Sequence, residues 1–304
     1  MKEMRVCFDF EIVFANGGGL QGQGFRLDIE GENITDQALA AYVIRDLRLL
    51  MVGEVRILNK VIIEEPHKRA LTARAAELAR QEMNFSDLSH TIESGMLTYP
   101  GLPAPLISDH MSRVQSRTTY DNRAEFQIGR IEMVANTGTY VDTPFHRYAG
   151  GEDLSSTPLR ALSHLPGVVV RLVGIETRSI DWPLLAATEI QGRAVLIHTG
   201  WDRHWRTEQY FQGHPFLTRA AAQYLRDERA ALVGIDSLNI DDTSDPERPA
   251  HSILLDAGIP IVEHMTRLDT LPNAGFTFFA TPPKIAGMGS FPVRAHAVWA
   301  RKSA

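Results

Sequence analysis

The sequence has almost no cysteine, no long apolar run and no excess of basic residues, and each absence excludes a class of protein. The single cysteine, Cys7, cannot form an intrachain disulfide and excludes multi-cysteine zinc and iron–sulfur sites, so any metal must bind His, Asp or Glu. The lack of a stretch of about 18 apolar residues argues against a membrane-spanning helix. The formal net charge is -6, which disfavours nucleic acid as a partner. We expect a globular protein of the reducing cytoplasm that interacts with neither nucleic acid nor membrane.

The first 65 residues predict a small ββαβ module. Apolar residues occupy every second position in the segments before and after an Asn-Gly-Gly-Gly turn at residues 16–19. This pattern indicates a β-hairpin over residues 5–30. A phosphate-binding loop is disfavoured because the glycines lack the GxGxxG and GxxxxGK[ST] spacings. Helical spacing over Asp36–Met51 and strand-like sequence over Glu54–Glu64 complete the module at residues 1–65.

A larger domain follows at residues 85–304. Residues 66–84 contain strong helix formers and no glycine, so we expect a linking helix there. Beyond it, prolines separate short apolar runs, and strand-like and helical segments alternate, which predicts an α/β or mixed α+β fold. The expected strands are Gly167–Val173, Ala194–His198, Ala231–Ile235, Ile259–Glu263 and Phe276–Ala280, with a helix over Thr218–Asp227.

The densest group of polar side chains lies in residues 136–146, which read NTGTYVDTPFH. In an extended chain Asn136, Tyr140, Asp142 and His146 would point to one side. Buried polar groups need partners, so such a group favours a functional site. A polar turn with a hydrogen-bonded histidine explains this segment equally well when it is taken alone.

Two residues farther along the chain extend this group. His251 opens an apolar helical segment, and Glu263 ends the strand-like sequence IPIVE. Either residue alone is more typical of a helix cap or a surface position. Together with Asp142 they form a possible metal-binding set, because imidazole and carboxylate ligands suit zinc and manganese.

The chain resembles, from about Phe85 to Trp299, the metal-dependent cyclase/hydrolase family that includes bacterial kynurenine formamidases and isatin hydrolases. The family signature HxGTHxDxPxH corresponds to NTGTYVDTPFH at residues 136–146. Further matches are DLSH ending at His90, GMLTYPG at 95–101, TGWD at 199–202, HPFL at 214–217 and GIDSLNI at 234–240, followed by His251 and Glu263. The resemblance implies a swivelling β/β/α fold, a homodimer or larger homo-oligomer, and a small-molecule substrate.

The resemblance also implies roles for individual residues. Asp142, His251 and Glu263 match metal ligands, and His146 matches the histidine that transfers protons. Asn136 and Tyr140 stand where the family has two further histidine ligands. Because neither is a common zinc ligand, we expect at most one divalent ion, and a site without metal is an open alternative. Tyr140 could instead donate a hydrogen bond to a substrate oxygen.

Four more residues are predicted to bind the substrate: His90, Trp201, His214 and Asp236. The tryptophan could form the wall of a pocket that accepts an aromatic group, although packing explains it as well. Asp236 is predicted at a strand end, where it could serve the site or cap the next turn. His214 matches the family and could equally be structural.

Three functions fit these residues. The first is metal-dependent hydrolysis of a C–N bond in an amide, formamide or lactam, with one zinc or manganese ion and with His146 as acid and base. The second is a metal-independent lyase, isomerase or cyclase that uses His146 in the same pocket. The third is a protein that binds a ligand without catalysis and interacts with a partner through its N-terminal module.

Overall fold

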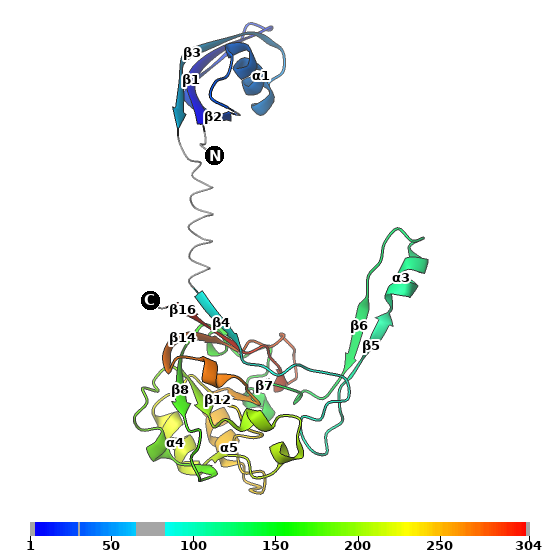
Figure 1. Cartoon of the computed structure of the whole chain (residues 1–304), viewed down its shortest axis with the longest axis vertical. Coiled ribbons are helices and arrows are strands. Elements are labelled where there is room, and N and C mark those ends of the chain that lie inside the picture. Colours follow the sequence, from blue (N-terminus) through cyan, green and yellow to red (C-terminus); the bar gives the residue numbers. More distant parts are fainter. Residues whose placement is uncertain (1–3, 30, 65–82, 302–304) are drawn as a thin grey trace. The chain divides into compact units, whose positions relative to one another are not determined.

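The computed structural model describes residues 4–29, 31–64 and 83–301 (Figure 1). The chain divides into two compact units, Met1–Glu82 and Met83–Ala304. The helix predicted over residues 66–84 lies outside the described residues, except that Met83 and Asn84 belong to a strand. No helix in the described ranges is long and apolar enough to cross a membrane.

The smaller unit is a three-stranded antiparallel sheet with one helix, in the predicted ββαβ order. Its elements are β1 (Met4–Phe14), β2 (Gly19–Ile29), α1 (Asp36–Asp46) and β3 (Val52–Glu64), and the strand order is β2-β1-β3. Alternate residues of β1, from Val6 to Ile12, form one buried cluster with Leu39 and Val43 of α1. The period of two that predicted the hairpin therefore marks the buried face of the sheet.

The helix of this unit is shorter than predicted. It ends at Asp46 rather than Met51, because the chain leaves helical geometry at Arg48, which has a φ of 51°. Leu50, whose apolar character suggested a longer helix, is 82% exposed and does not belong to the packed face. The following strand begins at Val52, two residues earlier than expected.

The larger unit is built on a nine-stranded mixed sheet with the order β15-β7-β13-β12-β10-β8-β14-β16-β4. The four strands β13, β12, β10 and β8 run parallel, and each strand outside this group is antiparallel to its neighbours. The bounds are β4 (Met83–Asp87), β7 (Tyr140–Asp142), β8 (Leu165–Arg171), β10 (Ala194–His198), β12 (Leu232–Ile235), β13 (Ile261–Glu263), β14 (Ala274–Phe279), β15 (Ser290–Pro292) and β16 (His296–Ala300).

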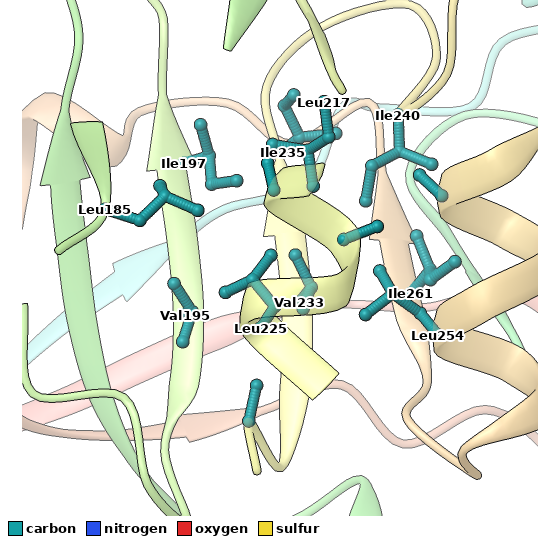
Figure 2. Packing of buried hydrophobic residues seen from close by; sticks show 14 of the residues in the cluster. Leu185, Val195, Ile197, Leu217, Leu225, Val233, Ile235, Ile240, Leu254 and Ile261 are labelled. Carbon is teal, nitrogen blue, oxygen red and sulfur yellow. The ribbon is translucent and has the colours of Figure 1, made fainter. Parts of the chain in front are cut away.

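Apolar side chains cover both faces of this sheet. Val195 and Ile197 of β10 belong to a cluster with Leu225 of α4 (Arg219–Asp227) and Leu254 of α5 (Pro249–Asp256), as Figure 2 shows. Leu196, between them in sequence, belongs to the cluster on the other face. Parallel strands that are buried on both sides are apolar along their whole length, and this is why the short apolar runs predicted strands.

The remaining elements are short and lie outside the large sheet. They are β5 (Leu106–Met111), α3 (Arg113–Thr119), β6 (Ile128–Glu132), β9 (Ser179–Ile180), β11 (Phe216–Leu217) and the 3-10 helices η1 (Pro144–His146), η2 (Leu159–Ala161), η3 (Trp182–Leu184), η4 (Trp201–His204), η5 (Glu208–Phe211) and η6 (Leu268–Thr270). The predicted mixed α/β class is confirmed. Ala194–His198 has the predicted bounds, and the other expected strands differ by one or two residues at one or both ends.

Candidate functional site

A cavity of about 430 Å³ gathers five of the ten predicted site residues. Asn136, Tyr140, His146, His251 and Glu263 line it. The rest of its wall is formed by Tyr99, Pro100, Gly101, Leu102, Arg147, Asn239 and Arg248. The volume is that of a site for a small organic molecule.

Strand pairing explains why residues distant in sequence meet here. β7 pairs antiparallel with β13, which sets Tyr140 opposite Glu263, and with β15, which sets Asp142 opposite Ser290. Directly opposed residues in antiparallel strands share a face, as do residues two apart in one strand. Three neighbouring strands therefore point polar side chains to one side, and η1 brings His146 to the same place directly after β7.

His251 is oriented by a carboxylate behind it. Its Nδ1 lies 2.7 Å from Asp241 Oδ2, and the same carboxylate accepts the backbone N–H groups of Ala250 and His251 at the start of α5. A carboxylate can only accept, so Nδ1 carries a proton and Nε2 faces Asp142 and Glu263. Burial lowers the pKa of His251, but the carboxylates outweigh it and raise the pKa to about 10. A carboxylate on the second nitrogen is how proteins orient metal-binding histidines.

Tyr140 and Glu263 form a buried hydrogen-bonded pair. The hydroxyl donates to Glu263 Oε2 at 2.6 Å, Ile240 N–H donates to Oε1 at 2.6 Å, and Asn239 Nδ2 lies 3.5 Å from Oε2. Burial raises the pKa of Glu263 to about 7 and raises the pKa of Tyr140 well above its usual value. Tyr140 is therefore a neutral phenol. Because its one proton is donated to Glu263, it cannot donate to a substrate oxygen at the same time.

Ser290 connects Asp142 to His146. Its Oγ is hydrogen-bonded to Asp142 Oδ1 and lies 2.8 Å from His146 Nδ1. Burial raises the pKa of Asp142, but His146 and His251 outweigh it, so the pKa is lowered and the group is a carboxylate. The serine must therefore donate to Asp142 and accept from His146 Nδ1–H. In this tautomer Nε2 of a neutral His146 is a proton acceptor, and the side chain is 35% exposed.

The same residues fit one divalent ion. Asp142, His146 and His251 offer donor atoms that lie within 4.8 Å of one another. Asp142 Oδ2 is buried and has no hydrogen-bond partner among the described residues. It lies 3.6 Å from His251 Nε2, and Glu263 Oε1 lies 3.7 Å from that nitrogen. Two ligands about 2.1 Å from a tetrahedral ion are separated by about 3.4 Å, so the spacing suits metal binding.

All four residues predicted to bind substrate lie outside the lining of this cavity, and two of them contact other aromatic residues. The His90 ring stacks on Trp205, with centroids 4.0 Å apart and planes at 6°. Trp201 Nε1–H donates to the backbone carbonyl of Tyr210 at 3.0 Å. In these positions both side chains stabilise the loops after β4 and β10.

The other two support the backbone. His214 is buried, and its Nε2 lies 3.0 Å from the backbone carbonyl oxygen of Asp241. Asp236 accepts hydrogen bonds from the N–H and hydroxyl of Thr199 and from Gly200 N–H, so it caps the turn that follows β10. Burial raises the pKa of Asp236 to about 7.

Several residues of the site were not predicted from sequence. Asp241 directly follows the GIDSLNI motif, and its position after a strand was the available signal. No local sequence pattern marks Ser290 or Arg248. Ser290 reaches the site through the pairing of β15 with β7, and Arg248 reaches it from the loop before α5.

Known proteins resemble this chain over the larger unit. A family model described as "Putative cyclase" matches residues 86–242, just over half of the chain. Kynurenine formamidase of Bacillus cereus is 24% identical over 210 residues, which cover 69% of this chain and 94% of the relative. The enzyme of the same name from Geobacillus thermodenitrificans is 26% identical over 211 residues, with the same coverage.

Solved structures share the fold. Isatin hydrolase A from Labrenzia aggregata bound to benzyl benzoate superposes with a TM-score of 0.65 at 22% identity, covering 76% of this chain and 99% of that chain. A structure described as a potential metal-dependent hydrolase with cyclase activity has a TM-score of 0.58 at 26% identity and covers 73% of this chain and 100% of that chain. The chain therefore belongs to the cyclase family of hydrolase enzymes.

Proposed function

We propose that this protein hydrolyses a C–N bond in a small amide, formamide or lactam, with one zinc or manganese ion. The observation that carries the proposal is the buried Asp142 Oδ2, which has no hydrogen-bond partner among the described residues and lies 3.6 Å from His251 Nε2. These two atoms would hold the ion, with Glu263 Oε1 as the nearest further carboxylate oxygen. The relatives named kynurenine formamidase support the choice of bond. When bound, the ion would polarise the substrate carbonyl and make water more acidic.

His146 is the residue proposed to move protons. Its Nδ1–H is held by Ser290, so Nε2 can accept a proton from the attacking water and return it to the leaving nitrogen. The carboxylate of Asp142, which holds Ser290 in turn, stabilises the imidazolium that forms. A proton acceptor fixed in one tautomer is what such a transfer requires, because the wrong tautomer presents a donor instead.

A second candidate is acid–base catalysis without metal in the same cavity. The carboxylates of Asp142, Asp241 and Glu263 surround His251, and a protonated His251 could balance part of their charge in the absence of an ion. In that case His146 would act as acid and base in a lyase, isomerase or cyclase reaction.

Metal content and turnover distinguish the two candidates. We expect about one zinc or manganese per chain by inductively coupled plasma mass spectrometry, and chelator-sensitive hydrolysis in a panel of amides, formamides and lactams. Asp142→Asn and His251→Gln should lose both metal and activity. His146→Gln should lose activity and keep its metal, because the proposal assigns the ion to Asp142, His251 and Glu263. His110→Gln, at an exposed histidine of β5, is the matched control. Metal-free, folded protein with chelator-insensitive turnover would overturn the first proposal and favour the second.

A further inference from the structure

Arg248 presents a guanidinium to the catalytic cavity from a constrained backbone position. It directly precedes Pro249, the first residue of α5, and has a φ of 48° and a ψ of 61°. This left-handed conformation is uncommon for a residue other than glycine, so the surrounding contacts must hold it in place. The side chain lies in the cavity wall, which Tyr99 also lines, and its Nη1 donates to Asn239 Oδ1 at 3.0 Å.

No carboxylate of the described residues forms an ion pair with this guanidinium. Other arginines of the larger unit have such partners: Arg219 pairs with Glu247, and Arg193 pairs with Glu189 at 2.6 Å. The hydrogen-bond partner of Arg248 is instead a neutral side chain, Asn239. A guanidinium has five N–H donors, so enough remain for a two-point contact with a planar anion.

A single residue, Asn239, lies between Arg248 and the proposed metal ligand Glu263. Asn239 accepts from Arg248 through Oδ1, while its Nδ2 lies 3.5 Å from Glu263 Oε2. One amide side chain therefore separates the guanidinium from the buried carboxylates. A second cation, Arg147, lines the same cavity and is anchored to the backbone carbonyl of Glu247 at 3.2 Å.

We propose that Arg248 is the recognition residue for a carboxylate on the substrate, so that the substrate is an amide bearing a carboxylate close to the bond that is cleaved. This inference rests on the proposed hydrolytic function. The remainder of the substrate faces Tyr99, Pro100 and Leu102, which suit an aromatic or aliphatic group. A planar carboxylate matches the fork of the guanidinium in two parallel hydrogen bonds.

Equilibrium binding tests the recognition independently of catalysis. Isothermal titration compares 3-phenylpropionate with its neutral analogue 3-phenylpropanamide, in protein as purified and after chelation, so that coordination of the carboxylate to an ion is separated from binding to Arg248. We expect the unmodified protein to bind the acid about 10- to 100-fold more tightly than the amide in both preparations. Arg248→Met should lose this preference, while Arg226→Met, at an exposed arginine of α4 that pairs with Asp227, should keep it.

Turnover adds a second readout with a matched pair of substrates. N-benzoylglycine and N-methylbenzamide differ only by a carboxylate, and we expect Arg248→Met to raise the KM for the first about 10- to 100-fold and to leave the second unchanged. If no amide, formamide or lactam of the panel is cleaved by any preparation, the hydrolytic proposal fails, and the titration still decides the role of Arg248. Equal affinity of the unmodified protein for acid and amide, or unchanged acid binding by Arg248→Met, overturns the inference.

Discussion

Replacing Asn136 and Tyr140 by histidine should increase the number of metal ions that the site holds. In this chain the Tyr140 hydroxyl donates to Glu263 Oε2, whose other contact is Asn239 Nδ2 at 3.5 Å. The double substitution frees that oxygen and adds two imidazoles beside it. Because a tetrahedral site needs about four ligands, we expect the variant to bind about one more divalent ion per chain than the unmodified protein.

The same change should make stability depend on metal. The lost hydrogen bond reaches a buried carboxylate, and such bonds contribute about 1.5 to 3 kcal/mol. In the presence of a chelator, the free energy of unfolding of the double variant should therefore be lower than that of the unmodified protein by about that amount. Free zinc at about 100 times its Kd should restore about 2.7 kcal/mol, because it binds the folded state alone.

Mass spectrometry of dialysed protein and urea unfolding with and without zinc measure the two effects. Tyr140→Phe serves as the control, since it removes the same hydrogen bond and adds no ligand. It should lose stability without gaining metal. A folded double variant that holds no more metal than the unmodified protein would refute the assignment of Asn136 and Tyr140 to the positions of metal ligands.

Three further outcomes follow from the contacts in and near the site. His146→Gln should lower kcat by about 10²- to 10⁴-fold in the amide assay with unchanged metal content, because it removes the proton acceptor. Ser290→Ala should lower kcat by about 10- to 100-fold and leave KM unchanged, because it removes the hydrogen bond that keeps the proton of His146 on Nδ1. Burial lowers the pKa of His90 to about 4, below the value of about 6.5 in unfolded chains, so stability is present above pH 6.5 and is lost as the pH falls towards 4. Between pH 7 and pH 5 this loss amounts to about 2 kcal/mol, and His90→Phe, which can keep the stacking on Trp205, should lack it in urea unfolding at the two pH values.

Local pattern predicted many elements of the fold and several residues of the candidate site. β10 has the predicted bounds because all five of its residues, Ala194–His198, are buried and its apolar run admits one interpretation. The signature at residues 136–146 predicted that Asp142 and His146 lie close together, and they do so because their spacing is local. His251 and Glu263 were joined to them by resemblance. The pairing of β7 with β13 brings Glu263 to this place, whereas the Asp241 carboxylate holds His251 at the start of α5.

Contacts between distant segments could not be predicted in this way. Ser290 lies 148 residues from Asp142, and only the pairing of β15 with β7 brings them together. The direction of a side chain could not be predicted either. Trp201 and Asp236 belong to motifs that resemble those of the family, yet Trp201 donates to a backbone carbonyl and Asp236 caps a turn. A motif identifies the residue type at a position, whereas the fold of the surrounding backbone decides the direction in which that side chain points.

The balance of charge around the cavity relates the proposed number of metal ions to the proposed charge of the substrate. With Glu263 ionised beside a bound divalent ion, Asp142, Asp241 and Glu263 would bring three negative charges to one imidazole, and that single ion would leave one of them unbalanced. Arg147 and Arg248 line the same cavity, so one ion and two guanidiniums together exceed the three carboxylates by one positive charge. That excess suits a substrate with one carboxylate. A second ion would raise the excess to three, and the neutral residues Asn136 and Tyr140 at the family's ligand positions therefore agree with both the single ion and the anionic substrate.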